Sequence, residues 1–502
     1  MNRREPMKIT RGLAILLLTL PFFIYACATL PPQQVVKSWE RPEACQELLA
    51  RLDAKVAEAG VGDAASYPIP GFPYLRANRF LSALKDRAKD EAERDQWVRW
   101  MQALDLKSRK EEIANLPDAG VLALGERGKV DRERLYSRVE SCSFQLLEHD
   151  QKRPDFYATL DPLIKIPDEY STFRQVIGLY PIVSLPVQVS AYYSRKKFQT
   201  WFDAGVGNLR LDGRLQSFIP RGGIFPEKSE LAGLMEESRK NPLKIPLPSR
   251  EQEDRLVGAF APIFIQDVAA SYDRLGEVVW KGERVEIDVK KPTVYYYLSY
   301  TFLKEEPILQ INYVIWYSSR AGENPPWFEK GHLDGLTLRV SLDSRGNPFM
   351  VDAINNCGCY HLFVPEKAKV ERVVSWPYEP PPFVPRWLPV FGPEERLAMR
   401  LNSGWHQVQS LLAVKEPANP IPYELVPYEV LESLPHENGQ RESIFDAQGI
   451  VKGSERPEQY ILFSMGIHKV GSMRQRGHQA IEFLNRVHFD APGLFEHYFD
   501  FK

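Results

Sequence analysis

Two short segments in the second half of the chain carry side chains that could bind a metal ion. One runs from residue 331 to 335 and the other from residue 355 to 361. The candidate ligands are His332, Asp334, Cys357, Cys359 and His361. Residues two apart in a strand point to the same face, so each segment would present its side chains on one side. If the two segments lie close together, they would form a site suited to zinc or a similar divalent metal.

Two other interpretations of Cys357 and Cys359 remain open. With Gly358 between them, they could close a small disulfide whose strain would make it labile or redox-active. The segment could also be a rigid turn that holds an ordinary histidine. The sequence lacks the short motifs of common hydrolases, metalloproteases, nucleotide-binding proteins and c-type cytochromes.

A second group of polar residues lies near the C-terminus. Arg474, Arg476 and His478 lie close to Gly477, where a helix is predicted for residues 477–487. Backbone N–H groups at a helix N-terminus and arginine side chains both favour anions, so this segment could bind one. A solvated basic loop is the simpler alternative.

Two cysteines in the first third of the chain are predicted to form a disulfide. Cys45 lies on the apolar face of a helix that begins at Pro42, and Cys142 lies on the apolar face of a helix from residue 131 to 149. Chain position would then pair Cys357 with Cys359. Closing the long loop between Cys45 and Cys142 would stabilise the fold by on the order of 4 kcal/mol in the chain-entropy model.

The elements that must position these residues change in type along the chain. Helical periodicity dominates from residue 42 to about 255, with a helical stretch at 75–116, although 206–250 is predicted to be mostly loop. Period-two alternation follows, with strands predicted at 285–289, 294–303, 308–317, 336–342, 349–354, 360–364, 399–414 and 460–465. We expect an α+β fold in which a mainly helical region (42–255) precedes a larger antiparallel β-rich domain (256–502). That domain would be a sheet, sandwich or open barrel with a short C-terminal helix.

One apolar run in the first half has two possible environments. Residues 176–187 are apolar but interrupted by Pro181 and Pro186, and tyrosines and basic residues follow them. The pattern favours a buried, proline-kinked helix. A membrane-facing patch is the alternative, because aromatic and basic side chains suit a membrane interface.

The N-terminus resembles the signal of bacterial lipoprotein precursors. Basic residues precede an apolar run of 14 residues (13–26), which ends in Ile24-Tyr25-Ala26-Cys27. Such a run is too short to span a bilayer core of about 30 Å comfortably. The resemblance implies that residues 1–26 are removed, that Cys27 is lipidated and that residues 27–41 form a tether. It also implies a place in the cell envelope, on the outer membrane facing the periplasm in a Gram-negative cell.

Composition sets limits on the partners of the chain. Without residues 1–26, the chain has 60 basic and 65 acidic residues, which gives no reason to expect nucleic acid. We therefore expect a membrane-anchored binding or assembly factor whose ligand is an envelope protein, a glycan or a peptide. A metal-dependent envelope hydrolase is the first alternative, and a thiol–disulfide role at Cys357 and Cys359 is the second.

Overall fold

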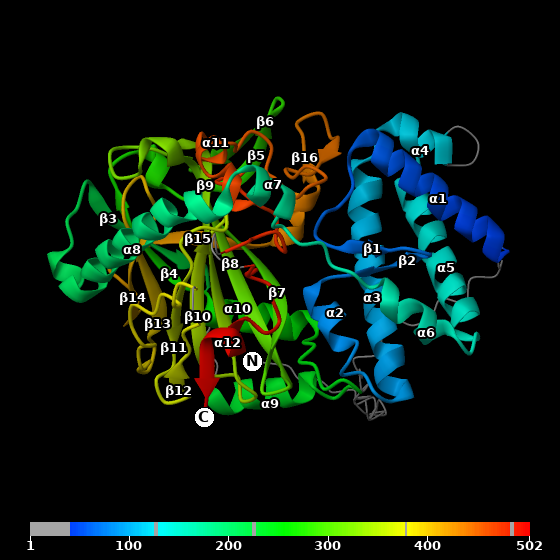
Figure 1. Ribbon diagram of the computed structural model, residues 1–502, viewed down its shortest axis with the longest axis horizontal. Coiled ribbons are helices and arrows are strands. Elements are labelled where there is room, and N and C mark those ends of the chain that lie inside the picture. Colours follow the sequence, from blue (N-terminus) through cyan, green and yellow to red (C-terminus); the bar gives the residue numbers. More distant parts are fainter. Residues whose placement is uncertain (1–40, 125–128, 223–226, 377–378, 482–485) are drawn as a thin grey trace, which may run out of the picture. The chain divides into compact units, whose positions relative to one another are not determined.

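The computed structural model describes residues 41–124, 129–222, 227–376, 379–481 and 486–502, which belong to one compact unit. The predicted signal segment, Cys27 and residues 28–40 of the predicted tether lie outside the described residues. Helices and one large sheet make up the fold, which confirms the α+β prediction (Figure 1). No helix in the described ranges is long and apolar enough to cross a membrane.

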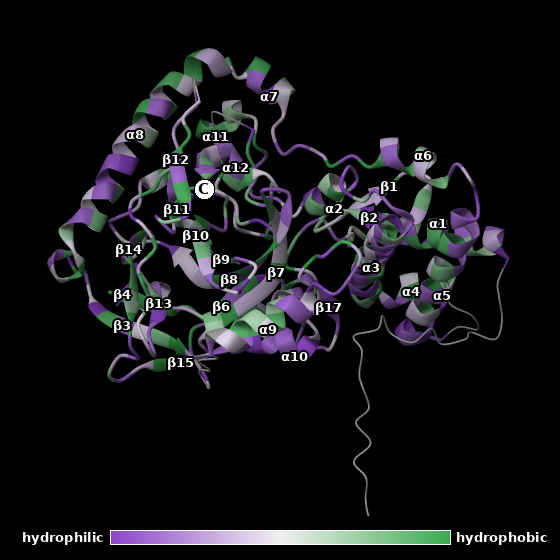
Figure 2. Ribbon diagram, turned by 90° about the horizontal axis from the view of Figure 1, so that it is seen from below, coloured by the Kyte–Doolittle hydropathy of each residue, from purple (hydrophilic) through white to green (hydrophobic). Residues whose placement is uncertain are grey.

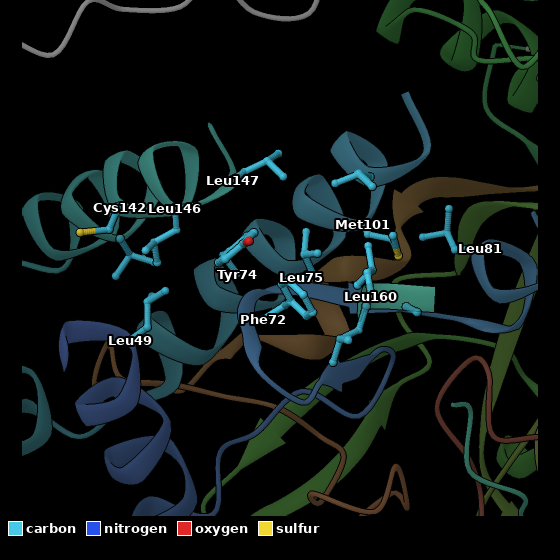
Figure 3. Packing of buried hydrophobic residues seen from close by; sticks show 14 of the residues in the cluster. Leu49, Phe72, Tyr74, Leu75, Leu81, Met101, Cys142, Leu146, Leu147 and Leu160 are labelled. Carbon is cyan, nitrogen blue, oxygen red and sulfur yellow. The ribbon is translucent and has the colours of Figure 1, made fainter. Parts of the chain in front are cut away.

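The N-terminal part is mainly helical and has an apolar core of its own. Its elements are α1 (Pro42–Ala59), β1 (Tyr67–Ile69), β2 (Phe72–Ala77), α2 (Arg79–Leu84), α3 (Glu91–Asn115), α4 (Asp118–Leu124), α5 (Arg132–Gln151) and α6 (Phe156–Leu160). Apolar residues at helical spacing on α1 and α5 meet those of α3 and β2 in one cluster (Figure 3). The burial of these apolar faces explains why the helices assemble.

Capping residues mark the ends of these helices. Pro42 lies in the first turn of α1, and Gly60, with a φ of 66°, ends it. A capping box between Asp90 and Glu93 starts α3. The helical stretch predicted for residues 75–116 is therefore divided, because β2 and α2 occupy its first part.

Cys45 and Cys142 form the predicted disulfide. Their Cα atoms are 5.1 Å apart, and the bridge joins α1 to α5 across a sequence separation of 97 residues. Both side chains are buried in the helical core. The bridge thus ties together two helices whose apolar faces already pack against each other.

A ten-stranded sheet forms the centre of the β-rich part. Its strands are β3 (Arg214–Pro220), β4 (Ile263–Val268), β7 (Thr293–Leu303), β8 (Glu306–Arg320), β9 (Gly331–Leu342), β10 (Pro348–Asn355), β11 (Leu362–Pro365), β13 (Arg396–Leu401), β14 (Val408–Val414) and β15 (Ile421–Pro427). Their spatial order is β11-β10-β9-β8-β7-β15-β3-β4-β13-β14. Strands β7 to β11 form an antiparallel meander, as the short predicted strands and the short turns between them indicated.

The large sheet is mixed, so the prediction of an antiparallel domain was only partly right. Strand β15 lies between β7 and β3 and is parallel to both, and β13 is parallel to β4. These pairs join segments that are far apart in the sequence, and the residues of a strand do not identify such a distant neighbour. Strand β3 and helix α9 (Lys228–Ser238) precede residue 256, and helix α10 (Arg250–Phe260) spans it. The prediction of mostly loop for 206–250 was therefore wrong over β3 and α9.

Smaller elements complete the fold. Strands β5 (Glu277–Lys281) and β6 (Arg284–Asp288), β12 (Val370–Val373) and β18 (Phe499–Phe501), and β16 (Leu434–Pro435) and β17 (Arg441–Glu442) form three two-stranded pairs. Residues 460–465, predicted as a strand, belong instead to helix α11 (Glu458–Ile461) and a 3₁₀ turn (Phe463–Met465). The described residues of segment 477–487 contain no helix, and the last helix is α12 (Leu494–Tyr498).

Helices α7 (Thr172–Ile177) and α8 (Tyr180–Ala204) lie beside the large sheet (Figures 1 and 2). Pro181 occupies the first turn of α8 and Pro186 lies within it, so the predicted proline-containing helix is present. The prediction that it is buried was wrong, because only Ser184 and Phe198 of α8 are buried.

Candidate functional site

A tight turn after β10 carries two free cysteines. Gly358 has a φ of 93°, and a Cβ atom there would lie 2.5 Å from the carbonyl oxygen of Ala480, so only glycine fits. The N–H of Gly358 donates to the carbonyl of Asn355 (2.8 Å), and the N–H of Asn355 donates to the carbonyl of Cys359 (3.1 Å). We call residues 355–360 the dithiol turn.

The two sulfur atoms of the dithiol turn interact with each other. Cys357 and Cys359 are free thiols in the structure rather than the predicted disulfide, and the thiol of Cys359 is hydrogen bonded to the sulfur of Cys357. This hydrogen bond, assisted by Arg320 and Arg456, lowers the pKa of Cys357 to about 6 although burial opposes ionisation. The same hydrogen bond raises the pKa of Cys359 well above its usual range. The pair thus shares one proton and carries one negative charge near neutral pH.

Two buried arginines supply positive charge beside the dithiol turn. Arg320 donates to both carboxylate oxygens of Asp334, at 3.0 and 2.9 Å, and to Glu329 at 2.7 Å. Arg456 donates through Nη2 to the carbonyl of Leu333 (2.9 Å) and to Asp334 (3.2 Å). The Nε and Nη1 atoms of Arg456 have no hydrogen-bond partner among the described residues. These two donors remain available to an anion beside them.

The protonated carboxyl group of Glu458 lies next to the thiol of Cys359. The sulfur of Cys359 is 4.0 Å from Oε1 of Glu458. Burial, reinforced by the negative charges of Glu329 and Cys357, raises the pKa of Glu458 to about 8. Glu458 therefore keeps its proton at neutral pH. A buried acid in this position can donate a proton to a leaving group at the thiol.

A second carboxyl group, that of Glu329, is held by three donors. Arg320 donates to it at 2.7 Å, the indole Nε1 of Trp405 donates at 2.8 Å, and the hydroxyl of Tyr360 also donates to it. Charge-assisted hydrogen bonds of this kind fix the position of a buried carboxylate. Glu329 and Tyr360 are thus rigid parts of the site.

Cys359 and both carboxyl groups line a cavity of about 360 Å³. Most of its other lining residues are apolar and come from α8, from the β11 region and from α11 and the residues after it. Cys357 is only 4% exposed, so a molecule in the cavity meets Cys359 first. The cavity therefore offers one accessible sulfur atom, backed by a second sulfur and by an acid.

The predicted metal ligands do not converge on one point. Leu333 has a φ of 58°, which interrupts the strand alternation between His332 and Asp334. The Nε2 atom of His332, which is partly exposed, lies 2.7 Å from the carbonyl oxygen of Val285. Asp334 is fully buried. Their side chains therefore lie in different surroundings.

The remaining predicted ligands are also engaged elsewhere. The Nε2 atom of His361 lies 2.8 Å from Asp352, which accepts hydrogen bonds from Arg339 as well. Within the described ranges, no group of three or more His, Cys, Asp or Glu side chains is arranged to hold a metal ion. The donor geometry of His332, Asp334, Cys357, Cys359 and His361 thus does not fit the predicted zinc site.

Asp334 is instead the centre of a buried charge network. Burial alone would raise its pKa, but Arg320, Arg456 and His406 hold the pKa of Asp334 well below its usual range. The ring of His406 lies 2.8 Å from Asp334 and 3.2 Å from Asp273, and it stacks on Tyr317. Asp334 therefore holds in place the two arginines that stabilise the thiolate.

The predicted anion site is not open in the structure. Arg474 donates to the carbonyls of His468 and Lys469, and Arg476 donates to Glu429 (3.2 Å) and Glu432 (2.6 Å). The ring nitrogens of His478 lie 2.8 Å from Glu169 and 2.6 Å from the carbonyl oxygen of Ala64. Each of the three side chains already has an acceptor within the protein, and the described residues of segment 477–487 contain no helix.

The sequence analysis missed four residues of the site: Arg320, Glu329, Arg456 and Glu458. Arg320 and Glu329 flank the turn between β8 and β9, so they lie close in sequence to the segment 331–335, in which His332 and Asp334 were predicted as ligands. Arg456 and Glu458 lie about 100 residues further along the chain, just before the segment 460–465 for which a strand was predicted. Charged residues are common in loops, and no local pattern distinguishes those that become buried.

Comparison with protein-family models, with curated proteins and with solved structures found no match to this chain.

Proposed function

We propose that this chain is a lipid-anchored protein of the cell envelope whose Cys357 and Cys359 take part in thiol–disulfide exchange. The observation that carries the proposal is the contact between two free sulfur atoms, one of which lies on the wall of a cavity. The thiolate is the reactive species in such exchange, and the accessible Cys359 becomes a thiolate when the proton of the pair moves to Cys357. The residues around Cys27 support the lipid anchor, and the Cys45–Cys142 disulfide is compatible with an oxidising compartment.

The first half of the exchange begins when the shared proton moves to Cys357. The thiolate of Cys359 then attacks one sulfur of a substrate disulfide. The S–S bond of the substrate breaks, a mixed disulfide forms at Cys359, and Glu458 gives its proton to the thiolate that leaves. Glu458 is 4.0 Å from the attacking sulfur, which suits this transfer.

In the second half, Cys357 resolves the mixed disulfide. Its sulfur attacks Cys359, its proton passes to the second leaving thiolate, and a Cys357–Cys359 disulfide remains. The substrate has gained two electrons and two protons, and Glu458 regains its proton from water. The reverse reaction oxidises a dithiol substrate by the same steps.

The cavity limits what can reach Cys359. Its volume of about 360 Å³ and its largely apolar lining are typical of sites for small molecules. We infer that the substrate presents a small thiol or disulfide, or a short cysteine-containing peptide segment, rather than a folded protein surface.

Equilibration with glutathione and glutathione disulfide tests the thiol chemistry. The mass of the peptide that contains residues 355–361 should fall by two hydrogen atoms at a defined ratio of the two reagents. In Cys357→Ser the reaction should stop at a glutathione adduct on Cys359, and Cys359→Ser should react slowly because Cys357 is buried. Thiols that stay reduced in the folded protein at every ratio would contradict the proposal.

Labelling with palmitate tests the anchor separately. The full chain expressed in a bacterium should incorporate the label, and Cys27→Ser should not. An unlabelled wild-type chain would remove the lipid anchor from the proposal without affecting the exchange reaction.

A second candidate function is the binding of an apolar ligand, which the largely apolar lining of the cavity favours. This corresponds to the binding factor expected from the sequence. A fluorescent fatty acid is a suitable probe, and the Cys357→Ser/Cys359→Ser double variant should bind it as well as the wild type does. Binding by both proteins, with thiols that are inert toward glutathione disulfide, would favour this function over exchange.

A further inference from the structure

Helix α8 has apolar side chains on two faces. Val183, Val187, Ala191 and Phe198 recur at helical spacing and line the cavity. A second set recurs on the outer side, and it consists of Leu179, just before the helix, with Ile182, Leu185, Val189, Tyr192 and Tyr193. The inner set lines the cavity, whereas the outer set is exposed in the part of the chain that the structure describes. Figure 2 shows α8 at the periphery of the β-rich part.

The outer set belongs to a larger exposed surface, which we call the α7–α8 face. Side chains of the outer set are between 56% and 67% exposed. Helix α7 adds three further side chains at 59% to 73% exposure, Phe173, Val176 and Ile177. Many exposed apolar side chains on two successive helices of a folded protein indicate a site of interaction with a partner or a membrane.

The charges of the α7–α8 face distinguish among possible occupants. From Thr172 to Phe202 the chain contains no aspartate or glutamate, and its charged residues are Arg174, Arg195, Lys196 and Lys197. The basic cluster begins at Arg195, two residues after the second of the two exposed tyrosines. Apolar side chains bordered by tyrosine and by lysine or arginine are characteristic of helices that lie in the interface of an anionic membrane.

We propose that the α7–α8 face docks on the surface of an anionic phospholipid bilayer, with α8 parallel to the membrane plane. Its apolar stripe enters the boundary between headgroups and acyl chains, and Lys196 contacts lipid phosphates. The helix lies on the membrane and does not span it, because none of the described helices has the length and apolarity for a span. The docking is independent of the thiol chemistry, and it adds a second membrane contact to the proposed anchor at Cys27. Membrane binding through a lipid anchor is generally strengthened by a second contact of this kind between the protein and the membrane.

Vesicle binding by the unlipidated chain tests this docking. The chain from residue 28 retains the whole compact unit and carries no lipid, so the α7–α8 face can act without the anchor. It should sediment with vesicles of phosphatidylcholine and phosphatidylglycerol, and more weakly with phosphatidylcholine alone. The Ile182→Asp/Leu185→Asp variant should lose about tenfold or more in vesicle affinity, because two apolar side chains no longer leave water. Lys196→Glu should reduce only the part of binding that depends on phosphatidylglycerol.

The matched control is Val390→Asp/Leu211→Asp, which changes two exposed aliphatic side chains outside the α7–α8 face. It should bind vesicles as the wild type does. Hydrogen exchange on the wild-type chain gives a second readout that needs no variant, since vesicles should slow exchange in residues 173–196. Equal binding by both double variants, or a wild-type chain that binds no vesicle, would overturn the proposal. Self-association through this face in place of vesicle binding would identify a second copy as the occupant and would overturn it as well.

Discussion

The sulfur of Cys359 lies 4.0 Å from Oε1 of Glu458, a carboxyl group whose pKa is raised to about 8. One member of a dithiol is thus adjacent to an acid that is still protonated at neutral pH. Burial is the main cause of the raised pKa, and the nearby charges of Glu329 and Cys357 add to it. The reactivity of the thiol should therefore respond to the ionisation of its neighbour.

Glu458→Gln should simplify the pH dependence of thiol reactivity. In the wild type, the rate of alkylation by iodoacetamide should change first as the dithiol ionises near pH 6 and again as Glu458 ionises near pH 8. The variant should lose the upper inflection, because glutamine stays neutral. Glu455→Gln, which replaces a partly exposed carboxylate three residues away, is the control and should keep both inflections. Superimposable wild-type and Glu458→Gln profiles above pH 7 would refute the assignment.

Glu458 should also make the folded protein less stable as the pH rises. Its pKa of about 8 in the folded protein exceeds the ordinary value of 4.5, so the unfolded state releases the proton first. The free energy of unfolding should therefore fall between about pH 4.5 and about pH 8. Urea midpoints measured across this interval should fall less steeply for Glu458→Gln than for the wild type. An equal slope in both proteins would show that Glu458 ionises normally.

Asp334→Asn should be strongly destabilising. Asp334 is fully buried, and its removal leaves Arg320, Arg456 and His406 without their shared carboxylate. Breaking a buried ion pair in this way typically costs about 3–5 kcal/mol of unfolding free energy. Chemical denaturation measures the cost, and Asp500→Asn, which breaks an exposed pair with Arg372, should cost about 0–1 kcal/mol. Similar costs for the two variants would argue against the buried network.

Gly358→Ala should damage the dithiol turn. The left-handed backbone and the contact between the new Cβ and the carbonyl oxygen of Ala480 should together cost about 1–3 kcal/mol. Alkylation of the thiols should also shift to higher pH as the sulfur–sulfur hydrogen bond is lost. Gly453→Ala is a matched control, because Gly453 has a φ of 76° but no atom within 4 Å of the added Cβ. If Gly358→Ala resembled this control in both measurements, the close contact at Ala480 would be disproved.

Replacing both Cys45 and Cys142 with serine should lower the unfolding free energy by about 2–4 kcal/mol. The bridge restrains a loop with a sequence separation of 97 residues in the unfolded chain. Urea denaturation with and without a reductant provides the test, since the reductant should destabilise the wild type but not the double variant. A wild-type protein that is insensitive to reduction while unfolded would show that the bridge does not form.

The sequence alone determined the features that depend on neighbours within one element. Helical spacing placed Cys45 and Cys142 on apolar faces, and β-prone segments separated by turn residues located β7 to β10. These patterns are local consequences of the periods of helix and strand, so they can be read without knowing the fold. The same local logic failed at His332 and Asp334, because the left-handed backbone of Leu333 breaks the period between them.

Only the tertiary structure decided the composition of the site and of the exposed surface. Arg456 and Glu458 lie beside the dithiol turn although they are about 100 residues away from it in the sequence. Strand β15 lies in the sheet between β7 and β3, and both of these strands precede it by more than 100 residues in the sequence. Whether the apolar run at α8 is buried or exposed likewise depends on what packs against each of its two faces. Burial and charge pairing are properties of the assembled fold, because they arise from groups that the chain brings together only when it folds.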